Sequence, residues 1–512
     1  MATVNKIDAN YTALAYAEEA VLGSLPGENG NAGTPAWKRV NPNSYSDFGG
    51  DIKTVSPNPI NPSRQRKKGV AVDIDATGGF NHNLSFYNMT DLMQGALFAN
   101  IRKKGQYPAT IIATTDDSYN LVGHTIPAGA LVYAVGFLNA ANNGFKNVLS
   151  IATNKILVSQ NLVDEGSPPA TASVFYVGVQ SAAGDVDVVN SGSAFPYLTS
   201  TILNFTTLGL VPGQWIYLGG DSAPTQFTNA VNNGYKRIRT IAANTMTFDK
   251  SSSTMVTEAN TTKTVQIFFG DVLKNETGSL IVQRSYNFER TLGAPIVGSG
   301  TLQSEVLIGA VINEMTFNIP QADLVNVDLK LMAIDNAQRT TTDTPKQTGV
   351  TNPYPADIFN STSDISRIRM HVLSDTDAFP TGLFAFLTDA SVTMTNNLTI
   401  DKAIGVFGGF DVTAGTFEVS GSVTAYFSTV QAVQAIRNSN NVTIDAIFAR
   451  DNRGIVLDLP LVALGDGRLK VDQDKPITMP LKMDAATSVD IDPNLDYTLM
   501  LTIFNYLPTV AC

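Results

Sequence analysis

The residues that could carry out chemistry are few and far apart in this sequence. Three histidines, His82, His124 and His371, have no other His or Cys nearby at the spacing that zinc ligands need. The single cysteine, Cys512, excludes an intramolecular disulfide and a cysteine cluster that could hold a metal. No Gly-x-Ser-x-Gly elbow, Walker loop or dinucleotide-binding glycine motif is present. We therefore expect no metal site, no cofactor and no enzymatic activity.

Two groups of carboxylates raise alternatives to this expectation. The stretch 73–78 places oxygen ligands at alternate positions before a glycine, as a calcium loop does, but Leu84 stands where a bidentate Glu should follow. A strand that runs into a Gly-Gly turn is the better interpretation. Asp490 and Asp492 could form a glycosidase pair, although acidic residues at strand spacing are far more often simply exposed.

Composition indicates a folded protein that is rich in β-structure. Hydrophobic residues make up 43% of the 512-residue chain, whereas only 15% are charged, against roughly 25% in an average soluble protein. Abundant Asn, Thr and Ser, together with 40 Gly and 24 Pro, favour strands joined by turns over helices. At roughly 100–200 residues per domain, the length predicts about three domains.

Charge and hydropathy exclude two classes of partner. The net charge of −11 lacks the basic footprint of a protein that binds a nucleic-acid backbone tightly. No run of about 18 apolar residues occurs, and no apolar segment of signal-peptide length begins the chain, so we expect no membrane insertion and no secretion signal. The expected product is a soluble protein made in a cytoplasm.

The middle third of the sequence contains an internal repeat. The stretch 127–133 aligns with 211–217, Asn142-Asn143-Gly144 aligns with Asn232-Asn233-Gly234, and the aromatic stretch 174–178 aligns with 266–270. Because order and approximate spacing are kept, we predict two tandem β-modules, at 105–182 and 183–275. A sugar-binding loop is an alternative for the two Asn-Asn-Gly blocks, but a tight turn is the favoured interpretation.

Long alternating strands lie on both sides of these modules. The stretch 416–427 has Phe417, Val419, Val423, Ala425 and Phe427 on one face and Glu418, Ser420, Ser422, Thr424 and Tyr426 on the other. The same alternation places Ser391, Thr393 and Thr395 opposite Ala390, Val392 and Met394, and it recurs at 325–333. Two short helices are expected, at 90–98 and 429–436, each with one apolar face.

The two flanks, 1–104 and 276–512, each contain strands, but neither makes a complete fold alone. We therefore expect one discontinuous β-domain with the two modules inserted after its first helix, because loop closure costs grow slowly with the length of an insertion. The polar side of its strands is nearly free of Lys and Arg. Such a side either faces bulk solvent or forms a wall along which a polyanion can slide without being held.

The sequence resembles the tail tube proteins of long non-contractile-tailed bacteriophages. In the C-terminal flank the resemblance rests on 396–405, 415–427 and 497–508, and in the N-terminal flank on 18–23, 37–44 and 62–70. It covers both flanks and spares the inserted modules. The single motifs are weak, but their order along two separated segments is fairly specific.

The resemblance implies an all-β subunit of the tail-tube type, a β-sandwich or barrel with a few short helices. It implies homohexameric rings that stack into a tube through which double-stranded DNA leaves the virion, with the inserted modules on the outside. The implied partners are further copies of the chain and the tape measure, tail terminator and tail tip proteins. The implied location is the virion tail, after synthesis in the host cytoplasm.

Within that scheme we predict two functional surfaces. The surface facing the lumen is expected to contain Glu418, Ser420, Ser422, Thr424, Ser391, Thr393 and Thr395, with the helix at 429–436 behind it. The alternative is that this face lies between subunits. A basic run in the arm 41–69 is expected to contact acidic loops of a neighbouring subunit, although such runs are usually solvated loops; it consists of Arg64, Arg66, Lys67 and Lys68.

Two rival classes remain at this stage. A phage head protein would need a long spine helix, and no helical pattern here exceeds a few turns. A β-rich adhesin or surface-binding decoration protein would explain the tandem modules, which could bind a glycan of the host surface.

Overall fold

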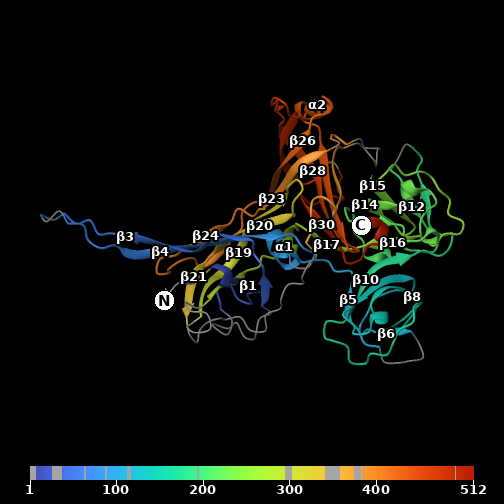
Figure 1. The fold of residues 1–512 in the computed structure, drawn as a ribbon, viewed down its shortest axis with the longest axis horizontal. Helices are drawn as coiled ribbons and strands as arrows, with labels where there is room; N and C mark the ends of the chain where they lie inside the picture. Colours follow the sequence, from blue (N-terminus) through green and yellow to red (C-terminus); the bar gives the residue numbers. More distant parts are fainter. Residues whose placement is uncertain are drawn as a thin grey trace. The chain divides into compact units, whose positions relative to one another are not determined.

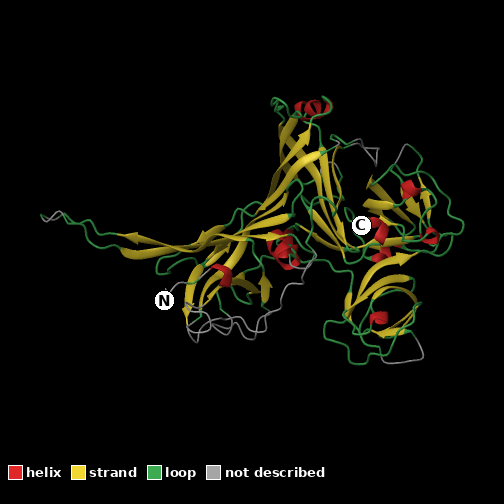
Figure 2. Ribbon diagram, in the orientation of Figure 1, coloured by secondary structure: helices red, strands yellow, loops and turns green. Residues whose placement is uncertain are grey.

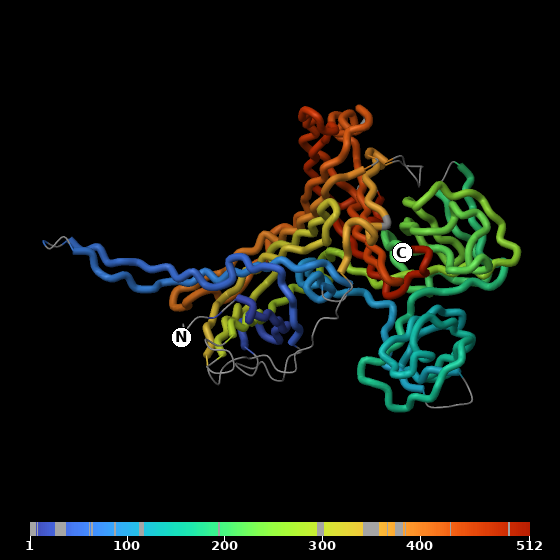
Figure 3. Tube along the Cα trace, in the orientation of Figure 1, coloured from blue at the N-terminus to red at the C-terminus, as the bar shows by residue number. Residues whose placement is uncertain are grey.

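A computed structural model divides the chain into two compact units. Unit 1 comprises residues 1–99, 276–361 and 387–424, and unit 2 comprises 100–275, 362–386 and 425–512. The structure describes residues 7–512 except 8, 26–36, 61, 63–64, 87–88, 112–116, 193–194, 294–301, 341–357, 374–381, 385 and 490–491. Figures 1 and 3 trace the chain through both units, which are described separately below.

The fold is mostly β-strand, as predicted, with two short α-helices in the described ranges (Figure 2). Helices α1 (Thr90–Leu97) and α2 (Gln431–Arg437) lie where the sequence predicts them. Within the part of the chain that the structure describes, the strands form antiparallel sheets that stay open, so the expected closed barrel is not present in a single chain. In these ranges, edge strands such as β3 (Ser44–Val55) and β11 (Asp187–Val189) each pair with a single neighbouring strand, so the sheets do not close.

Unit 1 is organised around one long strand. Strand β19 (Gln303–Ile319) pairs through its first half with β18 (Tyr286–Gly293) and β21 (Asp335–Thr340), and through its second half with β20 (Asn326–Ala333) and β23 (Leu387–Thr395). The other strands of unit 1 are β1 (Ala13–Glu18), β2 (Lys38–Val40), β3 (Ser44–Val55), β4 (Val70–Asn83), β24 (Thr399–Asp401), β25 (Asp411–Thr413) and most of β26 (Glu418–Tyr426). The neighbours β26, β23, β19, β20, β4 and β3 follow one another in that order.

One side of this strand series is the core of unit 1. Its buried side chains alternate along each strand, as the period of a strand requires, and include Phe80, Met315, Phe317, Leu329, Val392, Met394, Val419 and Val423. Helix α1 contacts β19 and β23. The buried Asn396, which follows β23, fixes the helix by donating to the carbonyl oxygens of Ala96 and Ile312, each at 2.9 Å.

Strands β3 and β4 form a long hairpin that extends beyond the rest of unit 1 (Figure 1). Its far end, from Asp51 to Val55 on β3 and from Val70 to Val72 on β4, is exposed on both faces. The arm that the sequence predicts at 41–69 is therefore the first strand of this hairpin and the connection to the second. An isolated two-stranded ribbon is marginally stable in water.

Unit 2 contains a separate 12-stranded sheet built from residues 106–269. Its strands are β5 (Gln106–Pro108), β6 (Ser118–Asn120), β7 (Ala130–Val135), β8 (Gly144–Ala152), β9 (Lys155–Val158), β10 (Ser173–Gln180), β11 (Asp187–Val189), β12 (Tyr197–Thr199), β13 (Trp215–Leu218), β14 (Gly234–Ile241), β15 (Thr245–Ser251) and β16 (Gln266–Phe269). A large apolar core lies within this part of the chain.

The remaining strands of unit 2 come mainly from the C-terminal flank. They are β17 (Asp271–Lys274), β22 (Ile365–Val372), β27 (Val442–Arg450), β28 (Arg453–Asp466), β29 (Thr478–Ala486) and β30 (Met500–Phe504). Aromatic side chains join this group to the 12-stranded sheet, because Tyr506 stacks on Phe145 and Tyr133 at centroid distances of 4.9 and 5.0 Å. Helix α2 packs against β28.

Candidate functional site

The polar side of the strand series in unit 1 is the strongest candidate site. We call it the polar face; it consists of Ser44, Ser46, Asn81, Asn83, Glu314, Thr316, Asn318, Asn326, Asp328, Lys330, Asp389, Ser391, Thr393, Thr395, Glu418, Ser420, Ser422 and Thr424. The face forms because polar residues alternate with the buried core residues on six neighbouring strands.

Side chains of the polar face hydrogen-bond to one another from strand to strand. Ser391 Oγ lies 2.9 Å from Ser422 Oγ, and Thr316 Oγ1 lies 3.0 Å from Thr393 Oγ1. Cross-strand pairs of this kind contribute roughly 0.2–1 kcal/mol each. They also fix the hydroxyl groups in place, so the face is a firm surface rather than a layer of free side chains.

Amide groups continue this network across β19, β20 and β4. Asn318 donates through Nδ2 to Asn326 at 3.0 Å and to Asp328 at 2.6 Å. Asn81 donates to the same two acceptors, at 2.9 and 2.7 Å, and accepts from Asn43 at 2.8 Å. The amide groups of Asn81 and Asn318 are thus used in bonds to their neighbours, which lowers their tendency to bind a passing ligand.

The charge of the polar face is acidic. Lys330 is the one basic residue among those that define the face, and its ammonium group pairs with Glu314 at 2.7 Å. The carboxylates of Asp328, Asp389 and Glu418 add negative charge. A surface of this kind cannot exchange its counterions for the phosphates of a nucleic acid, which is how proteins hold DNA tightly.

The structure brings all seven residues of the predicted lumen surface onto this one face. Glu418, Ser420 and Ser422 are exposed, and the other four are half-buried. Helix α2, which the sequence led us to expect behind them, packs against β28, and α1 contacts β19 and β23.

The contribution of β19 and β4 to the face was not predicted from the sequence. The signal was present, because Asn81 and Asn83 alternate with buried Phe80 and His82. In the same way, Glu314, Thr316 and Asn318 alternate with buried Met315, Phe317 and Ile319.

The arm presents apolar and basic groups without cover. Ile52, Val55, Val70 and Val72 are 54%, 60%, 63% and 51% exposed. In the connection between β3 and β4, Arg66, Lys67 and Lys68 of the basic run are exposed, and Arg64 lies outside the described residues. Apolar side chains on an unsupported ribbon mark a surface that binds another protein segment.

The candidate calcium loop is part of strand β4. Lys402 donates to Asp73 and to Asp75, at 2.5 Å each, and these bonds hold the pKa of both carboxyls below their ordinary values. The interpretation of 73–78 as strand is confirmed, but the expected Gly-Gly turn is wrong, because β4 continues through Gly78 and Gly79 to Asn83. Of the proposed glycosidase pair, Asp490 lies outside the described residues, and Asp492 is buried beside Arg239 at 3.2 Å.

Unit 2 contains a buried ionic cluster that joins its 12-stranded sheet to β27 and β28. Arg237 reaches Asp249 and Asp458, each at 2.8 Å, and Lys250 reaches Asp458 at 3.1 Å. Asp445 lies 2.7 Å from Arg367. Burial would raise the pKa of Asp445, but the charges of Arg367 and Lys250 outweigh it and lower that pKa to about 2.

The two Asn-Asn-Gly blocks make corresponding hydrogen bonds. In the first block, Asn143 Oδ1 accepts from Phe137 N at 3.0 Å; in the second, Asn233 Oδ1 accepts from Phe227 N at 3.0 Å. Asn142 of the first block and Asn232, at the equivalent position of the second block, are both fully buried.

In each block, a glutamate accepts a hydrogen bond from the buried Asn. Asn142 donates to Glu165 at 2.9 Å, and Asn232 donates to Glu258 at 2.8 Å. Each glutamate also accepts two backbone N–H groups from the preceding loop, those of residues 138 and 139 or of 228 and 229. The side-chain amides of both blocks are therefore used inside the protein.

Two properties of the described residues bear on other classes of function. No helix among them is long and apolar enough to cross a membrane. Across the same ranges, no three His, Cys, Asp or Glu side chains are grouped as metal ligands.

A family model described as phage tail tube protein matches residues 9–493. The match takes in the polar face, the arm and both Asn-Asn-Gly blocks. No curated protein matches the sequence.

Proposed function

Because this chain belongs to the phage tail tube protein family, we propose that it polymerises as stacked six-membered rings into the tube that delivers double-stranded DNA to the host. The family is structural and non-enzymatic, and its members self-assemble as part of the virion tail. The observation that carries the proposal is the polar face, which is broad, hydrogen-bonded and acidic.

We place the polar face on the wall of the lumen. Duplex DNA carries one negative charge per roughly 1.7 Å of its axis, so a basic wall would release counterions and hold it. The side chains of this wall are mostly Ser, Thr and Asn, several of which are hydrogen-bonded to one another, and its one ammonium group is paired with Glu314. DNA can therefore pass it without a strong attractive contact.

The arm is proposed to contact a neighbouring subunit. Its apolar residues Ile52, Val55, Val70 and Val72 gain cover in such a contact, at about 25 cal/mol for each Å² that they bury. The basic run lies in the connection at its end, and a chain with a net charge of −11 offers acidic loops to oppose it.

The stretch 105–275 is proposed to form two tandem modules on the outside of the tube. The corresponding bonds of Glu165 and Glu258 support two copies of one unit. Since the amides of both Asn-Asn-Gly blocks are used internally, decoration is favoured over glycan binding. A glycan array probed with the assembled tube tests the adhesin alternative. Tape measure, terminator and tip proteins are the expected partners at the lumen and the two tube ends.

Electron microscopy of the purified chain tests the proposal, since hollow filaments of fixed bore are expected and solid or absent filaments would contradict it. In virions, a Ser420→Lys, Ser422→Lys variant should eject DNA more slowly than wild type at low salt. The difference should fade at high salt, where phosphate binding weakens.

The matched control is Ser420→Ala, Ser422→Ala, which removes the same hydroxyls without adding charge. If the lysine variant forms normal tubes and ejects DNA at the wild-type rate, the polar face does not line the lumen. If it fails to form tubes, the face lies between subunits.

A further inference from the structure

Two sets of elements in this chain follow one another in the same order. The first, set A, is β1, the hairpin β3–β4, α1, β18, the hairpin β19–β20 and β21. The second, set B, is β22, the pair β23–β26, α2, β27, the hairpin β28–β29 and β30. The strand pairing also corresponds, because β1 pairs with β18 as β22 pairs with β27.

The long strands β19 and β28 occupy the same place in each set. The first half of β19 lies between β18 and β21, and the first half of β28 lies between β27 and β30. The second half of β19 pairs with β20, and that of β28 pairs with β29. Three strand neighbours therefore agree in order and in position along the strand.

The correspondence extends to single residues. Val311 pairs with Met332 in one hairpin and Ala463 pairs with Asp484 in the other, so the register agrees at this point, although a β-bulge after Ile312 then shifts the pairing of β19 by one residue. Aligned on that register, 325–333 and 477–485 have Leu, Lys and Ala at the same places. Ala322 and Asp474 then coincide, and both have a positive φ, of 54° and 59°.

The two sets differ in what covers the end of the long strand. In unit 1, β23 pairs with β19 along residues 314–319, and Phe317 and Ile319 are 2% and 6% exposed. At the corresponding positions in unit 2, Leu469 and Val471 are 42% and 69% exposed. Strand β28 ends at Asp466, where among the described residues β29 pairs with one edge and no strand pairs with the other.

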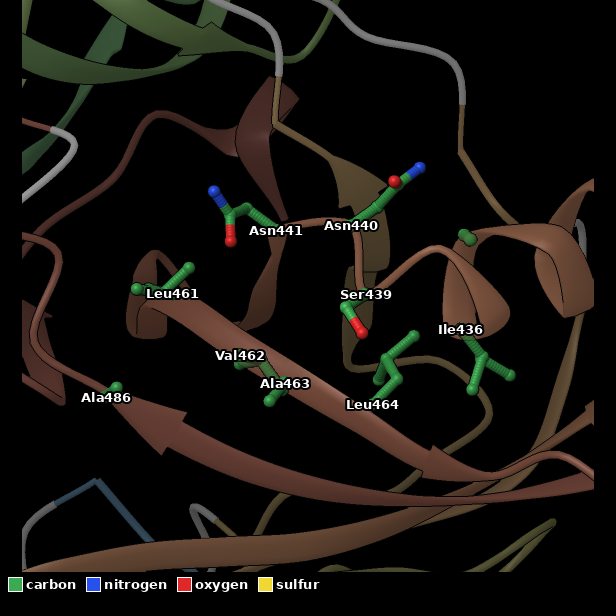
Figure 4. Close-up of a pocket in the computed structure, with 10 residues that line it drawn as sticks. Ile436, Ser439, Asn440, Asn441, Leu461, Val462, Ala463, Leu464 and Ala486 are labelled. Carbon is green, nitrogen blue, oxygen red and sulfur yellow. The ribbon is translucent and has the colours of Figure 1, made fainter.

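A pocket of about 160 Å³ lies beside the end of β28 (Figure 4). It is lined by Ala463, Leu464 and Ala486 on the strands and by Ile436 on α2. In unit 1 the corresponding residues, Val311 and Ile334, are buried against Leu398 and Val412, which belong to the segment between β23 and β26. The segment that fills this place in unit 1 has no counterpart at β28 in the described residues.

The counterpart of β23 in set A is β3. Among the described residues, β3 pairs with β4 and with no second strand, whereas β23 pairs with both β26 and β19. An unpaired edge of this length is normally covered in a stable assembly. The free edge of β3 and the uncovered end of β28 therefore correspond to the two partners of the β23–β19 contact that the chain already makes.

We propose that the chain contains two copies of one tube unit and that β3 of a second chain pairs with the end of β28, around residues 466–471, as β23 pairs with β19. This contact is heterologous and repeats from chain to chain, and it generates a ring when the rotation between neighbouring chains closes. This inference rests on the proposed function, in which a ring has six members. Because each chain supplies two tube units, a ring then contains three chains in place of six.

Two measurements on the full-length chain test this proposal. The mass of one ring, from mass per length and the axial repeat of wild-type tubes, should be three times the 54.6 kDa of the chain. A ring of six chains would overturn this inference and leave the tube function intact. Failure of the wild-type chain to form any hollow tube would overturn the proposed function itself.

The second measurement uses Leu469→Asp, which places a charge where the neighbouring strand should bury an apolar group. We expect loss of sedimentable tubes, with circular dichroism and thermal unfolding of the monomer unchanged because the residue is exposed. Leu149→Asp is the matched control, since Leu149 is 59% exposed on β8, and it should polymerise normally. Normal tubes from both Leu469→Asp and Val471→Asp would refute the interface.

Discussion

Asp458→Asn should be among the most damaging single substitutions in unit 2. The carboxylate of Asp458 is fully buried and receives bonds from Arg237 at 2.8 Å, Lys250 at 3.1 Å and Tyr497 at 2.9 Å. Burial would raise the pKa of Asp458, but the charges of Arg237 and Lys250 outweigh it and lower that pKa. The residue is therefore ionised in the folded protein.

The size of the effect follows from the charge balance of the cluster. Three cations, Arg237, Lys250 and Arg367, face three carboxylates, Asp249, Asp445 and Asp458. The substitution leaves the buried cluster with one positive charge in excess, and breaking a buried pair in this way costs about 3–5 kcal/mol. Burial already lowers the pKa of Lys250, so the loss should be smaller at alkaline pH, where this lysine is neutral.

Urea unfolding of the monomer measures this loss through the fluorescence of Trp215, which lies 5.2 Å from the guanidinium of Arg367. A Trp37→Phe background removes the other tryptophan of the chain. Asp496→Asn is the control, because Asp496 is 53% exposed and pairs with Lys274, and surface pairs contribute about 0–1 kcal/mol. If Asp458→Asn unfolds within about 1 kcal/mol of the control, the cluster does not stabilise unit 2 as argued.

Three further predictions concern Asp445, the two glutamates beside the Asn-Asn-Gly blocks, and the basic run. The pKa of Asp445 is lowered to about 2 in the folded protein, against about 4 in the unfolded chain. The resulting stability, roughly 2–3 kcal/mol, is present above about pH 4 and is lost as the pH falls toward 2. The free energies of unfolding of wild type and Asp445→Asn, measured against pH, should therefore differ above this range and converge below it. Glu258→Gln and Glu165→Gln should each lower the free energy of unfolding by about 1–3 kcal/mol, and a large effect of only one would argue against equivalent modules. Replacing the three described residues of the basic run by Glu should leave the monomer folded and stop polymerisation, as electron microscopy would show; normal tubes would exclude the arm contact.

The alternating strands and the two helices could be predicted because their signals are local. Side chains on a strand point alternately to opposite faces, so Ser391, Thr393 and Thr395 reveal a polar side without knowledge of any neighbour. The same holds for the apolar face of 90–97 and for the turn at each Asn-Asn-Gly block. The resemblance of both flanks to tail tube proteins is likewise a property of residue order and agrees with the family match over residues 9–493.

Contacts between distant segments could not be predicted, since no local pattern encodes them. Thr316 contacts Thr393, 77 positions away, and Arg237 contacts Asp458, 221 positions away. Arg and Asp are residue types that usually lie on the surface, so neither residue alone reveals a buried ion pair. The correspondence of β19 with β28 also rests on strand neighbours, because few identical residues survive between the two hairpins. The sequence by itself thus determined which side of each strand is polar and which family the chain belongs to. Only the tertiary structure decided which strands lie side by side, because pairing depends on the packing of whole segments against one another.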